Sequence, residues 1–497
     1  MRSFIFALLI VSGATPLLAA PPPSDAAIDD ILRDARTFWH APGIVAAIVR
    51  DDKVYLTGVG VRQLGSDKRV TPDTLFGIGS CTKAFTATAL ALLVDEGKAD
   101  WDDPVRKHWP GFRLDDPLAD RDVRLRDLLC HRIGLSRHDL LWYRAPWSIE
   151  ESVRRMAYLE RGSSFRSTYS YNNLAYLAAG LALGRIAKQP WHEFVQERLF
   201  KPLKMDRAVF TSGDARRAAD HASPHGHDAK GNVVVIPWYN DDKQIRASGS
   251  IKASVRDLSQ WLRFQLSGGK FGGKRLISAK ALEETHTPQI PVPLRAADRA
   301  AAATQASYGL GWHITAYRGH ALQEHGGAVD GFRARIILVP RKKLGLVLLT
   351  NLDDMEIVNA AGNNLLDRLL DLKPKDWNAF FAEEHRKAKA AEEERLRKKL
   401  KRVPATKPKD LALYVGTYSE PAYGTVTIKK KDGSLWLKWS SFQLPLTHLH
   451  YDTFRTPAKE LRLPTALRAE TAVFEMNEDG VIDTLRFLVR KFTRDKK

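Results

Sequence analysis

Residues 77–97, GIGSCTKAFTATALALLVDEG, predict an apolar helix that begins near Ser80 and is capped by Gly97. Ser80 and Lys83 are three residues apart, so their side chains share one face of that helix. A serine is a poor nucleophile unless a base takes its proton, and a lysine can be that base when burial lowers its pKa. About two Ser-x-x-Lys matches arise by chance in a chain of this length, so a helix start with an exposed lysine is the alternative.

Two further motifs carry side chains that fit this chemistry. Tyr171 and Asn173, in STYSYNNLAYLAAG, offer a hydroxyl that can pass a proton and an amide that both donates and accepts hydrogen bonds. His325, in QEHGGAVDGFRARIILVP, is followed by glycines that let a ligand approach a strand backbone. Taken singly, Tyr171 and Asn173 are more often a packed tyrosine beside a turn asparagine, and the His325 segment is equally well explained as a glycine-rich turn with an exposed histidine.

In this order, S-x-x-K, Y-x-N and H-x-G resemble the motifs of the serine β-lactamase and penicillin-binding-protein superfamily. The class C-like branch, with its D-Ala-D-Ala carboxypeptidases, D-aminopeptidases and esterases, is the most similar. The segments LLCHRIGL, ASVRDLSQWL, YGLGW and HGGAVDGF also match the family's framing, so the resemblance covers roughly residues 25–370. It implies an α/β fold of the β-lactamase and transpeptidase type, with an antiparallel sheet flanked by helices and a helical subdomain.

The resemblance assigns catalytic roles by position. It implies that Ser80 is the nucleophile and that Lys83 accepts its proton. Tyr171 would act as general base and acid, and Asn173 would orient both the substrate and the lysine. Which of Lys83 and Tyr171 takes the first proton stays open, as it does in related enzymes.

The third motif departs from the family's usual pattern. His325 stands where many relatives have lysine, and a histidine is mostly neutral near pH 7, which weakens the case for β-lactam hydrolysis and for strong carboxylate selection. The oxyanion hole would consist of the backbone N–H groups of Ser80 and of Ala328, the residue after Gly327. Arg333 and Arg335 are alternative sources of charge, although the sequence favours surface positions for both.

The resemblance implies an exported serine hydrolase that acts on an ester or amide, such as a D-amino-acid peptide or a small ester, through an acyl-enzyme on Ser80. Its expected partner is a small-molecule or peptide substrate, with cell-wall fragments among the candidates, and no cofactor is implied. The alternative is a catalytically silent relative that binds peptidoglycan fragments or a partner protein. The natural substrate, β-lactam hydrolysis and the oligomeric state stay open at this level.

The sequence predicts four segments along the chain. Residues 1–20, MRSFIFALLIVSGATPLLAA, are typical of a secretory signal peptide, so we expect a periplasmic or secreted protein without a stable membrane span. Residues 25–372 form the expected hydrolase domain, and residues 373–404 a charged helical linker. Residues 405–497 contain alternating aromatic and β-branched residues around the turn Asp432-Gly433, and they resemble the small lipocalin-like β domain that often follows such hydrolases.

The formal charge of +19 does not indicate nucleic acid as a partner. Much of it lies in residues 383–402, where Lys, Arg and Glu mix at helical spacing, as is typical of a solvated helix. His221, His225 and His227 lack the partners of a metal site, and a polar loop explains them. Cys81 and Cys130 leave two interpretations open, a disulfide in an exported protein or two buried free thiols.

Overall fold

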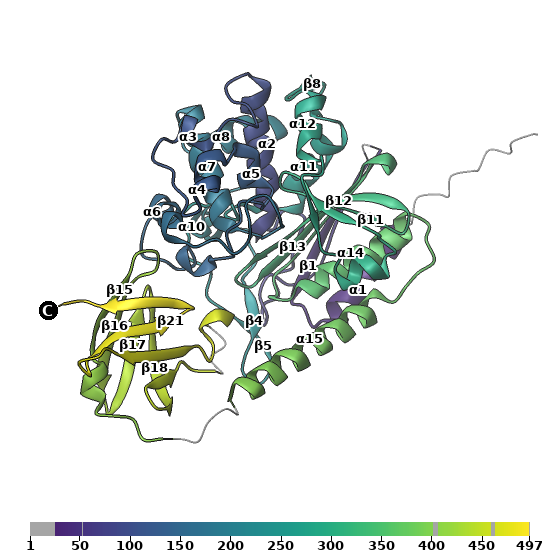
Figure 1. Ribbon diagram of the computed structural model, residues 1–497. Coiled ribbons are helices and arrows are strands. Elements are labelled where there is room, and N and C mark those ends of the chain that lie inside the picture. The colour runs from purple at the N-terminus through teal and green to yellow at the C-terminus, as the bar shows by residue number, and fades with distance from the viewer. Residues whose placement is uncertain (1–24, 52, 401–405, 459–462, 497) are drawn as a thin grey trace, which may run out of the picture.

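A computed structural model describes residues 25–51, 53–400, 406–458 and 463–496. Its first domain is built on an eight-stranded antiparallel sheet in the order β2-β1-β14-β13-β12-β11-β10-β9 (Figure 1). The strands are β1 (Gly43–Arg50), β2 (Lys53–Gly60), β9 (Ile290–Val292), β10 (Ala306–Tyr308), β11 (His313–Tyr317), β12 (His320–Val329), β13 (Phe332–Val339) and β14 (Leu344–Thr350). The first hairpin of the chain therefore pairs with the last strand of the domain, and the candidate site residues lie between them in sequence.

Both faces of the sheet's centre are buried, which explains why β1 is a continuous apolar run instead of an alternating one. Ile44 and Ala46 belong to the core on one face, and Val45 and Ala47 to the core on the other. The helices of the first face are α1 (Asp25–Phe38), α14 (Met355–Leu369) and the start of α15 (Trp377–Leu400). The second face packs against α11 (Val255–Leu266).

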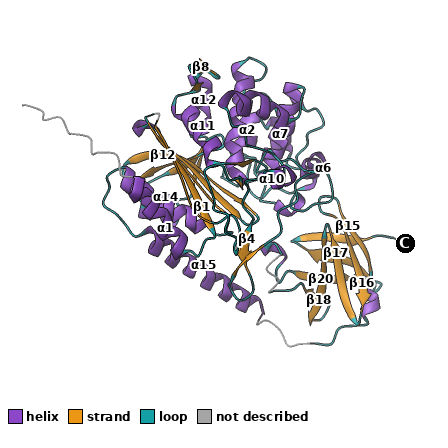
Figure 2. Ribbon diagram, turned by 180° about the vertical axis from the view of Figure 1, so that it is seen from behind, coloured by secondary structure: helices purple, strands orange, loops and turns teal. Residues whose placement is uncertain are grey.

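A helical region lies on the α11 side of the sheet, opposite α1 and α14 (Figure 2). Its centre is α2 (Thr82–Asp95), which is buried at every position from Thr82 to Leu93. A helix that is apolar all round is stable only when other elements enclose it. The enclosing helices include α7 (Asn173–Ala187), α8 (Trp191–Val195) and α12 (Ala279–Thr285), and α5 (Leu125–Leu129) packs against α7.

The C-terminal domain is a closed antiparallel barrel. Its strands are β15 (Gly416–Glu420), β16 (Gly424–Lys431), β17 (Ser434–Trp439), β18 (Phe442–His450), β19 (Thr453–Arg455), β20 (Thr471–Met476), β21 (Ile482–Phe487) and β22 (Arg490–Arg494). Asp432 and Gly433 form the predicted turn between β16 and β17, with the positive φ angles, +48° and +70°, that a two-residue hairpin prefers. Aromatic rings pack inside, since Tyr414 lies 5.0 Å from Phe454 and 4.9 Å from Phe474 between ring centroids.

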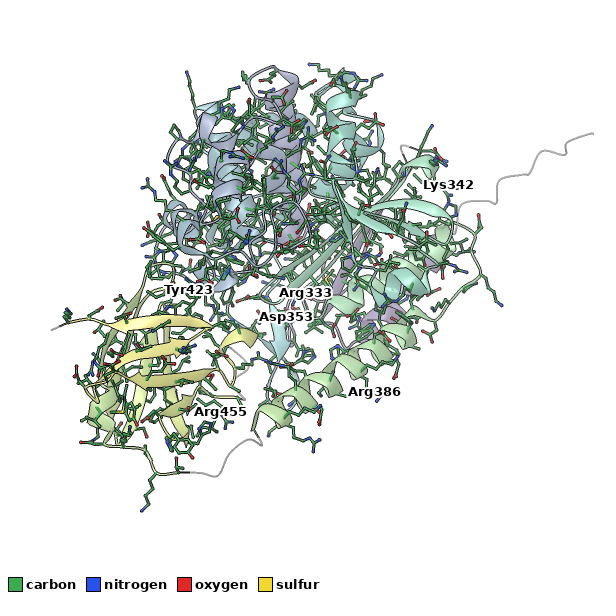
Figure 3. All side chains as sticks on the ribbon, in the orientation of Figure 1. Arg333, Lys342, Asp353, Arg386, Tyr423 and Arg455 are labelled. Atoms are coloured by element: carbon green, nitrogen blue, oxygen red, sulfur yellow. The ribbon has the colours of Figure 1, made fainter. Side chains whose placement is uncertain are left out.

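The barrel packs beside the helical region. α15 leads from the sheet toward the barrel (Figure 1), and side chains join the two domains directly. The Tyr423 hydroxyl lies 2.8 Å from Nδ1 of His138 (Figure 3). Arg490 donates to the carbonyl oxygen of Tyr158 at 3.0 Å. The barrel is therefore placed to form part of any cleft that opens on this side of the helical region.

The predicted fold class is confirmed in both domains, whereas the likeness of the barrel to lipocalins stays a prediction. The predicted signal peptide, residues 1–20, lies outside the described residues. Within the described ranges, no helix combines the length and the apolar character that crossing a bilayer demands. α15 occupies much of the segment predicted as a charged linker, and it carries exposed pairs such as Glu383–Arg386.

Candidate active site

Ser80 lies in a single 3-10 turn, Gly79–Cys81, that leads directly into α2. This turn is pressed against β12. A Cβ on Gly79 would meet the backbone nitrogen of Ala328 at 2.5 Å, and a Cβ on Gly327 would meet the carbonyl oxygen just before the turn at 1.9 Å. Only glycine fits at these two positions. The backbone of Ala328 consequently lies beside the serine, and Ser80, Gly327 and Ala328 line one cleft.

Lys83 lies one turn further along α2 and is fully buried. Its Nζ is 2.8 Å from Oδ1 of Asn173, 2.8 Å from the carbonyl oxygen of Ser248 and 3.0 Å from Oγ of Ser80. The first two oxygens can only accept, so they use two N–H bonds of the amine. A neutral amine has no third N–H bond, and its lone pair then faces the Ser80 hydroxyl. The geometry therefore allows Ser80 to donate its proton to Lys83.

The electrostatic surroundings favour that neutral amine. Burial lowers the pKa of Lys83 well below its usual value, and the positive charges of Arg137 and Arg246 lower it further. Asp139 opposes these effects. Because desolvation is the largest cause, the buried amine releases its proton more readily than an exposed lysine does, as a general base requires.

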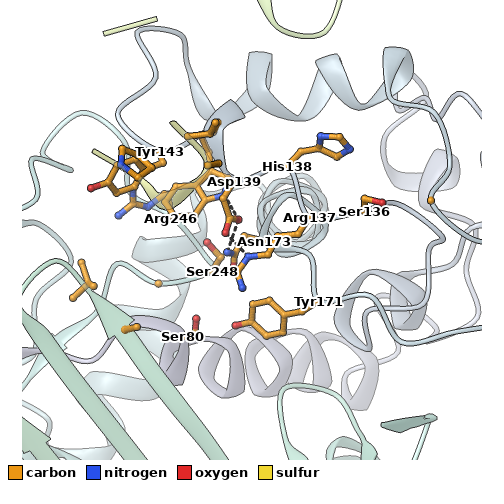
Figure 4. Close-up of a pocket in the computed structure, with 18 of the residues that line it drawn as sticks. Ser80, Ser136, Arg137, His138, Asp139, Tyr143, Tyr171, Asn173, Arg246 and Ser248 are labelled. Atoms are coloured by element: carbon orange, nitrogen blue, oxygen red, sulfur yellow. Dashed lines mark hydrogen bonds and ion pairs between the residues drawn. The ribbon is translucent and has the colours of Figure 1, made fainter. Parts of the chain in front are cut away.

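Asp139 fixes the orientation of the Asn173 amide (Figure 4). Oδ1 of Asp139 accepts from Nδ2 of Asn173 at 2.8 Å and from Nε1 of Trp142 at 2.9 Å, while Oδ2 accepts from Nε of Arg137. A carboxylate only accepts, so the amide must turn its NH₂ group toward Asp139 and its oxygen toward Lys83. The contacts form a chain that runs from Asp139 through Asn173 to Lys83 and Ser80.

Tyr171 points its hydroxyl toward Ser80 from the loop before α7 (Figure 4). Nζ of Lys83 lies 4.9 Å from the centroid of its ring. Burial raises the pKa of Tyr171, against the opposing effects of a hydrogen bond with Ser80 and the charge of Arg137. The tyrosine therefore holds its proton at neutral pH and can donate it to a group that leaves from beside Ser80.

His325 is buried on β12, so the alternative of a glycine-rich turn with an exposed histidine is wrong. Its Nδ1 lies 2.6 Å from the carbonyl oxygen of Gly326, which can only accept, so Nδ1 carries the proton. Its Nε2 then accepts from the Tyr308 hydroxyl at 2.9 Å. Burial lowers the pKa of His325 well below its usual value. The imidazole is thus neutral and has both nitrogens engaged, so it offers no charge for a substrate carboxylate.

Arg333 and Arg335 do not supply that charge either, and the preference for surface positions is wrong for Arg335. Arg335 is buried and forms two hydrogen bonds with Oε2 of Glu324, at 2.9 Å from Nε and 2.6 Å from Nη2. Its Nη1 reaches Asn363 of α14 at 2.9 Å. Arg333 pairs with Asp353 (Figure 3). Residues two apart on a strand share a face, so both arginines are directed toward α14 and away from Ser80.

The disulfide interpretation is wrong, because Cys81 and Cys130 are buried free thiols. Sγ of Cys81 donates to the carbonyl oxygen of His325 at 3.2 Å, and Sγ of Cys130 lies 3.9 Å from the carbonyl oxygen of Asp127. Burial raises the pKa of both thiols, that of Cys130 to about 12. Neither is a nucleophile at neutral pH.

The histidine-rich segment has a structural use at one position. His225 is buried on β4 (His225–His227), where its Nε2 accepts from the backbone N–H of Leu64 at 3.0 Å and its Nδ1 lies 2.9 Å from the carbonyl oxygen of Asn351. A polar loop is therefore the wrong description for this residue. In the part of the chain that the structure describes, no group of three or more His, Cys, Asp or Glu side chains converges as metal ligands do.

The candidate residues share a cleft of about 1340 Å³. β12 and the loop that carries Asp139 form two of its walls, and the barrel adds a third through Tyr423, Leu488 and Val489. Val489, at the tip of the β21–β22 hairpin, is fully exposed. Access to Ser80 is therefore shaped by both domains.

Three residues of the site escaped sequence reasoning. Asp139 follows the segment LLCHRIGL, which matches the family, but no motif in the sequence distinguishes Asp139 from an ordinary loop aspartate. Ser248 contributes only its carbonyl oxygen, which leaves no side-chain signal. Tyr308 begins the YGLGW segment, and the sequence does not show that its hydroxyl hydrogen-bonds to His325 in the folded sheet.

The β-lactamase family model matches residues 29–369, a range that includes every candidate catalytic residue. The chain belongs to the β-lactamase family. Its homologues include hydrolases, and we therefore assign this β-lactamase-family chain as a serine hydrolase. A second model, described as a domain of unknown function (DUF3471), matches residues 400–496 and so covers the barrel.

Individual relatives agree with this assignment. The chain is 28% identical over 437 residues to the unguisins hydrolase ungD' of Aspergillus campestris. The aligned region covers 82% of this chain and 78% of that protein. The octameric penicillin-binding protein homologue from Pyrococcus abyssi shares its fold, with a TM-score of 0.62, 22% identity, and coverage of 95% of this chain and 99% of that one. A D-stereospecific amidohydrolase from Streptomyces sp. has a TM-score of 0.57 at 22% identity, over 71% of this chain and 100% of that one.

Proposed function

We propose that this β-lactamase-family protein is an exported hydrolase that cleaves an ester or amide bond through an acyl-enzyme on Ser80. The observation that carries the proposal is the set of contacts around Lys83, whose Nζ lies 3.0 Å from Oγ of Ser80 while two acceptor oxygens occupy its N–H bonds. Such a lysine has the depressed pKa that a general base needs. Export rests on the leader in residues 1–20, and the mass of the mature N-terminus would test it.

The proposed reaction begins when Oγ of Ser80 attacks the substrate carbonyl carbon and its proton passes to Lys83. The carbonyl π electrons move to oxygen, where the backbone N–H groups of Ser80 and Ala328 stabilise the negative charge. When the tetrahedral intermediate collapses, the bond to the leaving group breaks and Tyr171 gives the leaving group a proton, which Lys83 then restores. Water releases the acyl group by the reverse set of transfers.

The other polar residues of the cleft position these reacting groups. Asn173 holds the amine of Lys83 and is in turn held by Asp139. Gly327 lets β12 lie directly against the turn that carries Ser80, since a side chain there would collide with a backbone carbonyl oxygen of that turn. His325, engaged by Tyr308, contributes shape and hydrogen bonding in place of a positive charge.

A D-amino-acid amide or peptide, or a small ester, is the proposed substrate class. The names of two structural neighbours, a D-stereospecific amidohydrolase and a D-amino acid amidase, support this class, although their identity to this chain is only 22% and 21%. A D-amino-acid amide or peptide would present a carbonyl next to an amino-acid side chain in the cleft that Ser80 lines.

Turnover of paired chromogenic substrates tests the proposal. D-alanine and L-alanine p-nitroanilides, p-nitrophenyl butyrate and nitrocefin would be offered to the wild type and to Ser80→Ala. We expect ester or amide turnover with a preference for the D-anilide, and a loss of about 10³-fold or more in Ser80→Ala. Full activity in that variant would refute the assignment of Ser80. A wild type inert toward all four compounds and toward a fluorophosphonate would favour the catalytically silent binding protein.

A further inference from the structure

The position of Asp139 depends on elements outside its own loop. Asp139 begins the single 3-10 turn η2 (Asp139–Leu141), and its carboxylate fixes the amide of Asn173 at 2.8 Å. One such turn is not stable alone, because fixing its backbone costs more entropy than its few hydrogen bonds return. The geometry of η2 must therefore come from the elements that contact the loop.

The C-terminal barrel contacts this loop directly, one residue before Asp139. The hydroxyl of Tyr423 lies 2.8 Å from Nδ1 of His138, and Tyr423 is buried between the domains. In Figure 4 the ring of His138 turns away from Ser80, whereas Asp139 points toward Asn173. Successive residues of the loop thus face the barrel and the reaction centre. A contact on His138 restrains the backbone from which the side chain of Asp139 starts.

A second contact with the barrel restrains the other end of the turn. Arg155 donates to the carbonyl oxygen of Ala422 at 2.9 Å. Its guanidinium carbon lies 4.2 Å from the centroid of the Trp147 ring, and Nε1 of Trp147 donates to the carbonyl oxygen of Leu141 at 2.6 Å. The barrel therefore acts on both ends of η2, on the residue before the turn and on its last residue.

The barrel presents both contacts on one well-fixed turn between β15 and β16. The carbonyl oxygen of Tyr423 accepts from Nε1 of Trp439 at 2.8 Å, and the two rings stack with their centroids 5.7 Å apart. The backbone N–H of Tyr423 donates to the carboxylate of Glu420. Gly424 has a φ of +73°, and a Cβ there would lie 3.2 Å from Nη1 of Arg155. The turn is thus held by the barrel core and fits closely against the hydrolase domain.

We propose that the C-terminal barrel is a positioning domain for Lys83, the proposed catalytic base. The turn that carries Tyr423 holds the loop of Asp139, and Asp139 orients the amide that binds the lysine amine. Displacement of this loop turns the amide and shifts the amine relative to Ser80. The inference rests on the proposed function of Ser80, and it gives the barrel a role in catalysis in which none of its residues touches the reacting atoms.

Removal of a single hydroxyl group tests the proposal. Tyr423→Phe keeps the stacked ring and deletes only the contact with His138. Asp139→Ala and the double variant show whether the effect runs through Asp139. Tyr418→Phe is the matched control, because the hydroxyl of Tyr418 donates to the carbonyl oxygen of Tyr414 at 3.0 Å inside the same barrel.

Two measurements are made on the full chain of each variant. The first is the second-order rate constant for labelling of Ser80 by diisopropyl fluorophosphate, a compact reagent that reports the reactivity of the serine. The second is hydrogen–deuterium exchange of the peptide that spans residues 136–143. In this peptide the backbone N–H groups of Leu141, Trp142 and Tyr143 are hydrogen-bonded within the loop, so their exchange reports how often the turn opens.

We expect Tyr423→Phe to be labelled about 3- to 10-fold more slowly than wild type, as befits the loss of one neutral hydrogen bond. Its peptide 136–143 should exchange faster. In the Asp139→Ala background the same substitution should change the labelling rate by less than about twofold, because the group through which it acts is already absent. Tyr418→Phe should match wild type in both measurements.

Wild-type labelling or wild-type exchange in Tyr423→Phe would overturn the positioning role. An equal loss with and without Asp139 would overturn it too, because Tyr423 would then act independently of that carboxylate, and so would a loss of the same size in Tyr418→Phe. Labelled wild-type Ser80 without an effect of Tyr423→Phe removes this inference alone. Unlabelled wild-type Ser80 removes the proposed function, and the exchange measurement still decides whether the barrel holds the loop.

Discussion

Replacing Lys83 with methionine should change how the stability of the protein depends on pH. Lys83 is fully buried, and burial lowers its pKa well below the value of 10.5 that it has in the unfolded chain. Between these two pKa values the unfolded chain holds one more proton than the folded protein. The free energy of unfolding therefore rises with pH across that window, by about 1.4 kcal/mol per pH unit from this one group.

Methionine keeps a similar length but does not titrate. Its substitution also leaves Oδ1 of Asn173 and the carbonyl oxygen of Ser248 without their donor, at a cost of about 1–3 kcal/mol each. That cost is the same at every pH. It therefore shifts the difference in unfolding free energy between wild type and Lys83→Met by a constant amount and does not change how that difference depends on pH. Between the two pKa values the wild type should therefore gain stability relative to Lys83→Met as the pH rises, by about 1.4 kcal/mol per pH unit.

Urea unfolding at pH 7, 8 and 9, followed by tryptophan fluorescence, measures this difference. Ser80→Ala is the matched control because it alters the same site and retains the lysine, so its difference from wild type should stay constant with pH. A flat difference between wild type and Lys83→Met would show that Lys83 keeps its proton in the folded protein. It could not then be the base that activates Ser80.

Three further predictions follow from single contacts. Asp139→Ala should lower kcat by about 10- to 100-fold while far-UV circular dichroism is unchanged, because the Asn173 amide loses the acceptor that fixes its orientation; wild-type kcat would contradict this role. Gly327→Ala should destabilise the protein by roughly 1–3 kcal/mol in urea unfolding, because its Cβ collides with a carbonyl oxygen, and an unchanged midpoint would argue against the close approach. Cys81 and Cys130 should be unreactive toward a thiol reagent in the folded protein, with two thiols titrating after unfolding without reductant; none at that stage would indicate a disulfide.

The local elements of the fold were predictable because their signals are local. The apolar run around Ser80 predicts α2, since a helix without a polar face must be buried. The Asp432-Gly433 pair predicts its hairpin because few other residues adopt two successive positive φ angles. Ser80 and Lys83 lie one turn apart on the same face, so their contact needed no tertiary information.

The remainder of the site depends on tertiary placement that spacing does not encode. Arg335 looks like a strand surface residue until the carboxylate of Glu324 on β12 is found hydrogen-bonded to it. His325 looks exposed until the Tyr308 hydroxyl is found on its Nε2. Asp139 is one loop carboxylate among many, and only the folded chain shows that it orients the amide of Asn173. In each case the deciding partner comes from a different element.

The most direct test of Ser80 as the nucleophile is the site of covalent modification by a fluorophosphonate. The folded wild type would be labelled at neutral pH, digested and mapped by mass spectrometry, with Ser80→Ala and urea-unfolded protein treated in parallel. An activated serine beside Lys83 predicts one adduct, on the peptide that contains Ser80, and none in the variant or in the unfolded chain. An adduct on another residue, or no adduct on the folded wild type, would contradict the proposed active site.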